Sequence, residues 1–216
     1  MSSPGTTPRP PDLRLIVITD VALAAPRSVR DVVAAALDAG APAIQLRDKS
    51  AAASTLLEEA RELLTLVRRY GALLFINDRI DVALAAGADG VHLGPDDVPV
   101  HAARRIAPQL LIGFSTDDPD TARRAQQDGA DYIGCGAVFG TRTKDVGEEA
   151  VGVDRLNAVA DAVSIPVVGI GGVTTENAGQ IATSRAAGAA VVGAVMAAQD
   201  PAEAVRTLLH PFRRAG

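Results

Sequence analysis

The chain has 216 residues, of which 21 are Lys or Arg and 26 are Asp or Glu, giving a formal net charge of −5. A negative net charge argues against a nucleic-acid-binding protein, because such proteins need a basic surface. The hydrophobic share is 48%, but the aromatic residues are only two Tyr and four Phe, so the core must consist mainly of aliphatic side chains.

The single cysteine excludes an internal disulfide and a zinc site built from several thiolates. No apolar run reaches the roughly 18 residues of a membrane span, and no charged-then-apolar signal peptide is present. We therefore expect a cytoplasmic protein without a membrane partner. Residues 1–11 are rich in Ser, Pro and Thr and are predicted to be a disordered tail, followed by one domain over residues 12–216.

A repeated pattern of glycine followed by an apolar run organises the chain, at 39–47, 86–94, 128–136 and 187–195. Its glycines are Gly40, Gly87, Gly129 and Gly188. A glycine just past a helix end can adopt the left-handed conformation that closes the helix. The apolar run that follows is typical of a strand buried on both faces.

Strands are predicted at 13–18, 43–47, 72–76, 89–93, 110–114, 131–134, 166–170 and 189–193. Helices are predicted at 28–39, 52–70, 79–86, 98–107, 118–128, 152–163, 175–184 and 201–213. Strands that alternate with helices pair in parallel through right-handed crossovers. Eight such units predict an α/β fold of the (β/α)8 TIM barrel type, with an open doubly wound sheet as the alternative. No Gly-x-Gly-x-x-Gly motif follows the first strand, which argues against dinucleotide binding.

Function in such a barrel lies where each strand ends. After the second strand, Gln45, Arg47 and Lys49 alternate onto one face. An amide and two cations on one face predict an anion site, most simply for phosphate. The alternative is a solvated strand end in which Arg47 pairs with a nearby carboxylate.

Carboxylates follow the third and fourth strands. Asn77 and Asp78 could bind a ligand or cap the helix at 79–86. Asp96 and Asp97 could supply oxygen ligands for Mg²⁺ or cap the helix at 98–107. Both interpretations stay open for each pair.

Three further strand-end residues have reactive side chains. Ser115 could bind an oxyanion, but no Gly-x-Ser-x-Gly motif marks it as a nucleophile. A lone histidine in a strand, such as His92, is more often structural than catalytic. Cys135 lies between two glycines without an identifiable base, so we interpret it as a packed thiol.

Two glycine- or hydroxyl-rich loops near the C-terminus could hold phosphate groups. Thr141, Thr143 and Lys144 form a compact cluster of anion-binding side chains, with an ordinary basic surface turn as the alternative. The Gly171-Gly172 pair and the 193–196 turn, which includes Val195 and Met196, could bind phosphate through backbone amides. The competing explanation for Gly171 and Gly172 is that they form a tight turn that needs positive φ.

Together these residues predict two anion sites, one of cationic side chains and one of backbone amides. Carboxylates beside the cationic site would repel a bare anion, and a bridging Mg²⁺ would remove that conflict. A reaction that expels pyrophosphate onto a second, phosphorylated substrate would use both sites.

The ordered motifs of residues 13–200 resemble the thiamine phosphate synthase family. They are Gln45-x-Arg47-x-Lys49, Ile76-Asn77-Asp78-Arg79, the stretch from Gly87 to Gly94 with Asp97, Gly113-x-Ser115, Asp131-Tyr132-Ile133-Gly134, Thr141-x-Thr143-Lys144 and Gly169-Ile170-Gly171-Gly172.

The resemblance implies a barrel enzyme that joins 4-amino-2-methyl-5-hydroxymethylpyrimidine diphosphate to hydroxyethylthiazole phosphate. Thiamine phosphate and diphosphate would be the products. It also implies that Mg²⁺ and cationic side chains promote departure of diphosphate, leaving a pyrimidine carbocation that the thiazole nitrogen captures. The expected partners are therefore small molecules, and a homo-oligomer is left open.

The resemblance also assigns roles by position. It places Asp78 and Asp97 on Mg²⁺, and Gln45 and Asn77 on the aminopyrimidine. The implied diphosphate ligands, which would also stabilise its departure, are Arg47, Lys49, Ser115, Thr143 and Lys144. The implied thiazole-phosphate ligands are Thr141, the Gly171-Gly172 turn and the backbone at Val195 and Met196.

The chain departs from the family pattern at three positions. Asp117 stands where many relatives have a histidine two residues after the serine that matches Ser115. Pro95 stands where the family usually has a polar residue after the glycine. Near Met196, many relatives have a serine that this chain lacks. The acidic loop 145–149 would adjoin the diphosphate, and whether it is a mobile lid stays open. Two alternative functions stay open, a thiazole tautomerase-like paralogue and a catalytically silent sensor of a phosphorylated ligand. The missing histidine argues against the tautomerase.

Overall fold

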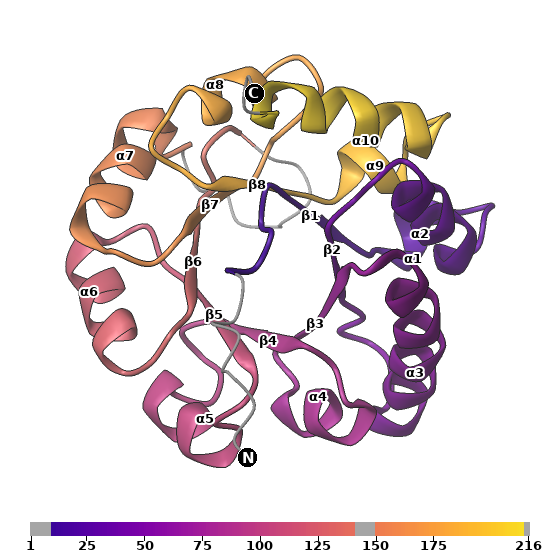
Figure 1. The fold of residues 1–216 in the computed structure, drawn as a ribbon, viewed down its shortest axis with the longest axis horizontal. Coiled ribbons are helices and arrows are strands. Elements are labelled where there is room, and N and C mark those ends of the chain that lie inside the picture. Colours follow the sequence, from indigo (N-terminus) through magenta and orange to yellow (C-terminus); the bar gives the residue numbers. More distant parts are fainter. Residues whose placement is uncertain (1–9, 141–149, 214–216) are drawn as a thin grey trace, which may run out of the picture.

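The computed structural model describes residues 10–140 and 150–213 and forms a closed barrel in which each strand pairs in parallel with the next. The last strand pairs with the first, so the sheet has no edge, and the open doubly wound alternative is excluded (Figure 1). The strands are β1 (Leu15–Ile18), β2 (Ala43–Leu46), β3 (Leu73–Asn77), β4 (Gly90–Leu93), β5 (Leu111–Ser115), β6 (Tyr132–Cys135), β7 (Val167–Ile170) and β8 (Gly188–Val191).

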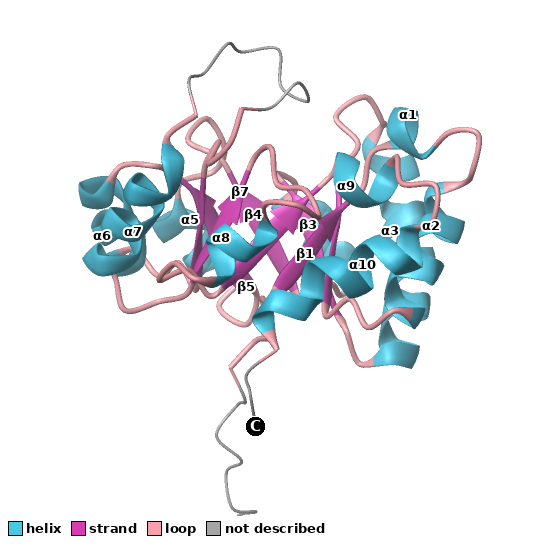
Figure 2. Cartoon of the chain, turned by 90° about the horizontal axis from the view of Figure 1, so that it is seen from above, coloured by secondary structure: helices cyan, strands magenta, loops and turns pink. Residues whose placement is uncertain are grey.

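Helices surround this barrel on the outside (Figure 2). They are α1 (Val21–Ala24), α2 (Val29–Asp38), α3 (Ala53–Tyr70), α4 (Ile80–Ala86), α5 (Val100–Ile106), α6 (Pro119–Gln127), α7 (Gly152–Ala162), α8 (Ala178–Ala182), α9 (Gly193–Met196) and α10 (Pro201–Leu209), followed by a short 3₁₀ helix, η1 (His210–Phe212). None of the helices in the described ranges is both long and apolar enough to cross a bilayer.

The eight predicted strands and the helices between them are confirmed, with shifts of a few residues at their ends. Their local signals act as expected: the Asp118 side chain accepts a hydrogen bond from the Thr121 amide at the start of α6, with Pro119 in its first turn. The short helices α1 and α9 were not predicted. The predicted tail falls mostly on residues 1–9, which lie outside the described residues.

The interpretation of Gly188 as a helix-closing glycine is wrong. Gly40, Gly87 and Gly129 have positive φ after a helix, as predicted, whereas Gly188 is the first residue of β8. A Cβ on Gly188 would lie 2.0 Å from the Leu13 carbonyl oxygen. The glycine is therefore required because the chain that enters β1 passes directly against β8 where the barrel closes.

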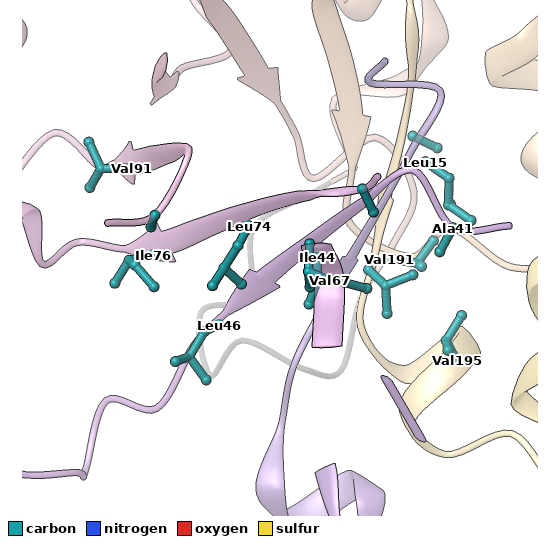
Figure 3. Packing of buried hydrophobic residues seen from close by; sticks show 14 of the residues in the cluster. Leu15, Ala41, Ile44, Leu46, Val67, Leu74, Ile76, Val91, Val191 and Val195 are labelled. Carbon is teal, nitrogen blue, oxygen red and sulfur yellow. The ribbon is translucent and has the colours of Figure 1, made fainter. Parts of the chain in front are cut away.

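The hydrophobic core has two parts, because alternate strand residues point to opposite faces. The outer part lies between strands and helices, and Figure 3 shows Ile44 and Leu74 on the same side of the sheet as Val67 of α3. The inner part fills the barrel with a small cluster that includes Ile16, Phe75 and Tyr132.

The same alternation brings polar residues into the barrel above this inner cluster. Gln45 is in register with Phe75, and Asn77, one inward position further along β3, is in register with His92. Ser115 ends β5 beside Gly134 of β6. The inward-facing row at the carboxyl ends of β2 to β5 is therefore polar, which places the candidate site at this end of the barrel.

Candidate functional site

Two carboxylates lie next to each other at this end of the barrel. Asp78 follows β3 and donates its amide hydrogen to the His92 carbonyl oxygen at 2.8 Å. Its φ of 62° is the one positive value at a non-glycine residue in the described part of the chain. Backbone strain of this kind concentrates at functional sites. Asp97, in the loop after β4, accepts a hydrogen bond from the Gly94 amide at 2.7 Å.

Neither carboxylate caps the helix that follows it. The N-cap position of α4 is Arg79 and that of α5 is Pro99, and neither helix has a side-chain capping hydrogen bond. The capping alternative is therefore not what the structure contains for either pair. Both acidic side chains therefore lie at the barrel mouth without serving as helix caps.

The two carboxylates interact electrostatically. Partial burial, followed by the neighbouring Asp78, raises the pKa of Asp97, while the Gly94 hydrogen bond and the Lys49 charge act in the opposite direction. The Lys49 ammonium lies 3.4 Å from Asp78 Oδ2. A cation between the two carboxylates would remove their repulsion.

These residues fit Mg²⁺ as a partly hydrated ion. Among the described residues, no cluster of three or more His, Cys, Asp and Glu side chains could enclose a metal. Mg²⁺ is commonly held by one or two carboxylates, with substrate phosphates and water completing the shell. Asp78 and Asp97 therefore suit a metal that binds together with a phosphorylated substrate.

The predicted anion-binding face follows β2, with Gln45 inside the barrel and Lys49 at its rim. Gln45 is 3% exposed and makes no side-chain hydrogen bond to the rest of the described chain, so its amide is available to a ligand. Thr19, which was not predicted as a site residue, holds the end of β2 in place. Its hydroxyl accepts a hydrogen bond from the Arg47 amide at 2.9 Å, and its own amide donates to the Gln45 carbonyl oxygen. Its position at the end of β1 was the available signal.

Ser115 belongs to a partly buried group of polar side chains. Its Oγ lies 2.8 Å from Nε2 of His92, and His92 Nδ1 lies 2.9 Å from the hydroxyl of Tyr132. The prediction of a structural His92 did not include either contact, and Tyr132 was not singled out. Cys135 is fully buried, which raises the pKa of its thiol to about 12. The predicted packed thiol is confirmed.

The glycine pair after β7 has both positive φ values and close neighbours. Gly171 and Gly172 have φ of 93° and 64°. A Cβ on Gly171 would lie 2.6 Å from Ala137, and one on Gly172 would lie 2.5 Å from the Gly140 carbonyl oxygen. Turn geometry and packing against the loop after β6 thus account for both glycines, and a phosphate is not needed to explain them.

After β8, only part of the backbone that was predicted to bind phosphate has amides without an acceptor among the described residues. Val195 and Met196 are fully buried, and their amides donate to the Val192 carbonyl. The amides of Gly193 and Ala194 donate to no acceptor within residues 10–140 and 150–213. A phosphate at this turn would therefore meet the amides of Gly193 and Ala194 first.

Part of the predicted site cannot be placed. Thr141, Thr143, Lys144 and the loop 145–149 lie outside the described residues. Asp117, at the position where relatives have a histidine, is exposed after β5.

Comparisons with known proteins agree with this geometry. The family model for thiamine monophosphate synthase matches residues 15–195. Thiamine-phosphate synthase of Chloroflexus aurantiacus is 47% identical over 197 residues, covering 91% of each chain. That of Natronomonas pharaonis is 46% identical over 200 residues, covering 91% of this chain and 94% of the relative. The structure of thiamine phosphate pyrophosphorylase from Pyrococcus furiosus superimposes with a TM-score of 0.86 at 42% identity, covering 94% of this chain and 96% of that one.

Proposed function

The chain belongs to the thiamine monophosphate synthase family of transferases, and from this membership we propose that it joins 4-amino-2-methyl-5-hydroxymethylpyrimidine diphosphate to hydroxyethylthiazole phosphate. The products would be thiamine phosphate and diphosphate. The observation that carries the proposal is the Asp78–Asp97 pair beside Lys49 at the mouth of the barrel. An arrangement of two acids and a base suits a metal-bound diphosphate better than a bare anion.

In this proposal the chain's own residues hold the leaving group. Arg47 and Lys49 extend from the end of β2 and would bind the diphosphate oxygens, and Ser115 would donate a hydrogen bond to them. Asp78 and Asp97 would hold Mg²⁺, which neutralises charge that develops on the departing diphosphate. Thr143 and Lys144 would complete the contacts, as the family resemblance implies.

The remaining polar residues would orient the two heterocycles. Gln45 and Asn77 point into the barrel and would hydrogen-bond the aminopyrimidine. Thr141, the turn of Gly171 and Gly172 and the backbone after β8 would hold the thiazole phosphate. The apolar inner cluster fills the barrel below this polar row and would keep water from reaching a pyrimidine carbocation from that side until the thiazole nitrogen captures it.

The proposal predicts that the purified protein releases diphosphate only when both heterocycles and Mg²⁺ are present. Release is measured by coupling diphosphate to a chromogenic pyrophosphatase assay, and thiamine phosphate is detected by mass spectrometry. A chelator should abolish both signals, and added Mg²⁺ should restore them. Omission of either heterocycle is the internal control.

The assay also separates the alternatives. A tautomerase would change the thiazole without releasing diphosphate, and a silent sensor would bind without forming any product. Either result with saturating substrates would contradict the transferase. A cytoplasmic location stays a prediction from the sequence, and the oligomeric state stays open.

A further inference from the structure

Three polar side chains from neighbouring strands form a continuous hydrogen-bonded row inside the barrel. Tyr132 of β6, His92 of β4 and Ser115 of β5 are joined by contacts of 2.9 Å and 2.8 Å. His92 and Tyr132 meet across β5 because Gly113 lies in register between them. A Cβ on Gly113 would lie 2.2 Å from Tyr132 Cζ and 2.5 Å from His92 Nδ1, so glycine is needed there for the two rings to meet.

Burial determines where the protons of this row lie. Tyr132 is 1% exposed, and burial raises the pKa of its hydroxyl well above the usual value, so the group stays protonated. Its hydroxyl has one hydrogen-bond partner among the described residues, His92 Nδ1. A buried donor without an acceptor is costly, so Tyr132 must donate to Nδ1. His92 Nδ1 is then unprotonated, and a neutral His92 has its proton on Nε2.

The same logic fixes the direction of the Ser115 hydroxyl. With its proton on Nε2, His92 donates to Ser115 Oγ, and the serine hydrogen must point elsewhere. Within the described ranges Ser115 makes no other side-chain hydrogen bond. Its hydrogen is therefore available at the barrel mouth, where the oxygens of a diphosphate can only accept.

We propose that Tyr132 and His92 are positioning residues that orient Ser115 as a hydrogen-bond donor to the diphosphate leaving group. The inference rests on the proposed function for the identity of the ligand. It assigns no chemical step to His92 or Tyr132, because both act through Ser115. Charge develops on the diphosphate as it departs, so a donor already oriented toward it favours the transition state over the bound substrate.

The first test is the tautomer of His92, which is independent of turnover. Nitrogen-15 NMR of the histidine rings should show His92 protonated on Nε2 and unprotonated on Nδ1. The exposed His101 and His210 can be assigned by replacing each with Gln. A neutral His92 with its proton on Nδ1 would overturn the proposed positioning role of Tyr132 and His92.

The second test is a double-mutant cycle on diphosphate release. Tyr132→Phe removes only the hydroxyl and should lower kcat roughly fivefold to tenfold, the factor that one ordinary hydrogen bond carries, with little change in KM. Ser115→Ala should lower kcat about 100-fold. In the Ser115→Ala protein, the further change of Tyr132 to Phe should have no effect on kcat. Equal losses in both backgrounds would overturn the proposal.

A matched control separates positioning from a packing defect. Phe75 touches Tyr132 edge-on, with ring centroids 5.4 Å apart, but lies outside the polar row. Phe75→Leu should therefore change kcat by the same factor with or without Ser115. An inactive wild-type protein would overturn the proposed function, and with it the diphosphate as the ligand of Ser115. An active enzyme in which His92 has the other tautomer would overturn only the positioning role of Tyr132 and His92.

Discussion

Asp97→Asn is expected to lower kcat about 100-fold and to raise the Mg²⁺ concentration needed for half-maximal activity by at least tenfold. Asp97 is one of the two carboxylates that the described residues place at the proposed metal position, so a neutral amide there removes half of the charge that this pair brings to the ion. The measurement is diphosphate release as a function of Mg²⁺ at saturating concentrations of both heterocycles. Asp78→Asn should act in the same direction, and Asn tolerates the positive φ found there.

Folding should not suffer from this change. Asn can still accept the hydrogen bond that the Gly94 amide donates to Asp97. Because partial burial raises the pKa of Asp97, its protonated form is favoured in the folded state, and that contribution to stability is present at low pH and lost as pH rises through the folded pKa. Without Mg²⁺ at neutral pH, Asp97→Asn should therefore melt at the same temperature as wild type or higher.

The neighbouring Asp96 provides the control. It is exposed and one residue away from Asp97, so Asp96→Asn makes the same change in net charge at nearly the same place. Its kcat and Mg²⁺ dependence should match those of wild type. Wild-type kinetics in Asp97→Asn, or equal losses in both variants, would exclude Asp97 as a metal ligand.

The strands were predictable because of their burial on both faces. A run such as LIVI in β1 has every side chain buried, and only a parallel sheet covered by helices makes that pattern common. The glycines that follow α2, α4 and α6 marked the helix ends for a local reason, their positive φ. In contrast, α1 and α9 have four residues each, too few for helical periodicity to show.

Site residues were predictable where their position at the end of a strand was enough to place them in the site. Gln45, Asp78 and Asp97 could be placed because function in a parallel barrel gathers at the carboxyl ends of the strands. The contact of His92 with Tyr132 could not, because it depends on register across three strands and on the missing side chain of Gly113. Thr19 was missed for a related reason, since its bonds to β2 follow from barrel closure.

The inner cluster depends on one of the chain's few aromatic side chains, and this gives the prediction with the largest effect on stability. Phe75→Ala is expected to lower the free energy of unfolding by about 3–5 kcal/mol. Phe75 is fully buried at the centre of the barrel, and its edge-on contact with Tyr132 adds to the loss. Urea unfolding followed by circular dichroism measures the change through the midpoint at constant m-value.

The size of this effect follows from what surrounds the ring. A Cβ on Gly90 would lie 2.6 Å from two Phe75 ring atoms, so the barrel reserves this space for the ring. Its walls are hydrogen-bonded strands that cannot collapse into a cavity, which makes truncation costly. Phe75→Leu, which keeps most of the volume, should cost less than half as much, and the partly exposed Phe212→Ala should cost about 1 kcal/mol. Equal losses for Phe75→Ala and Phe212→Ala would show that the barrel interior can close around the missing ring.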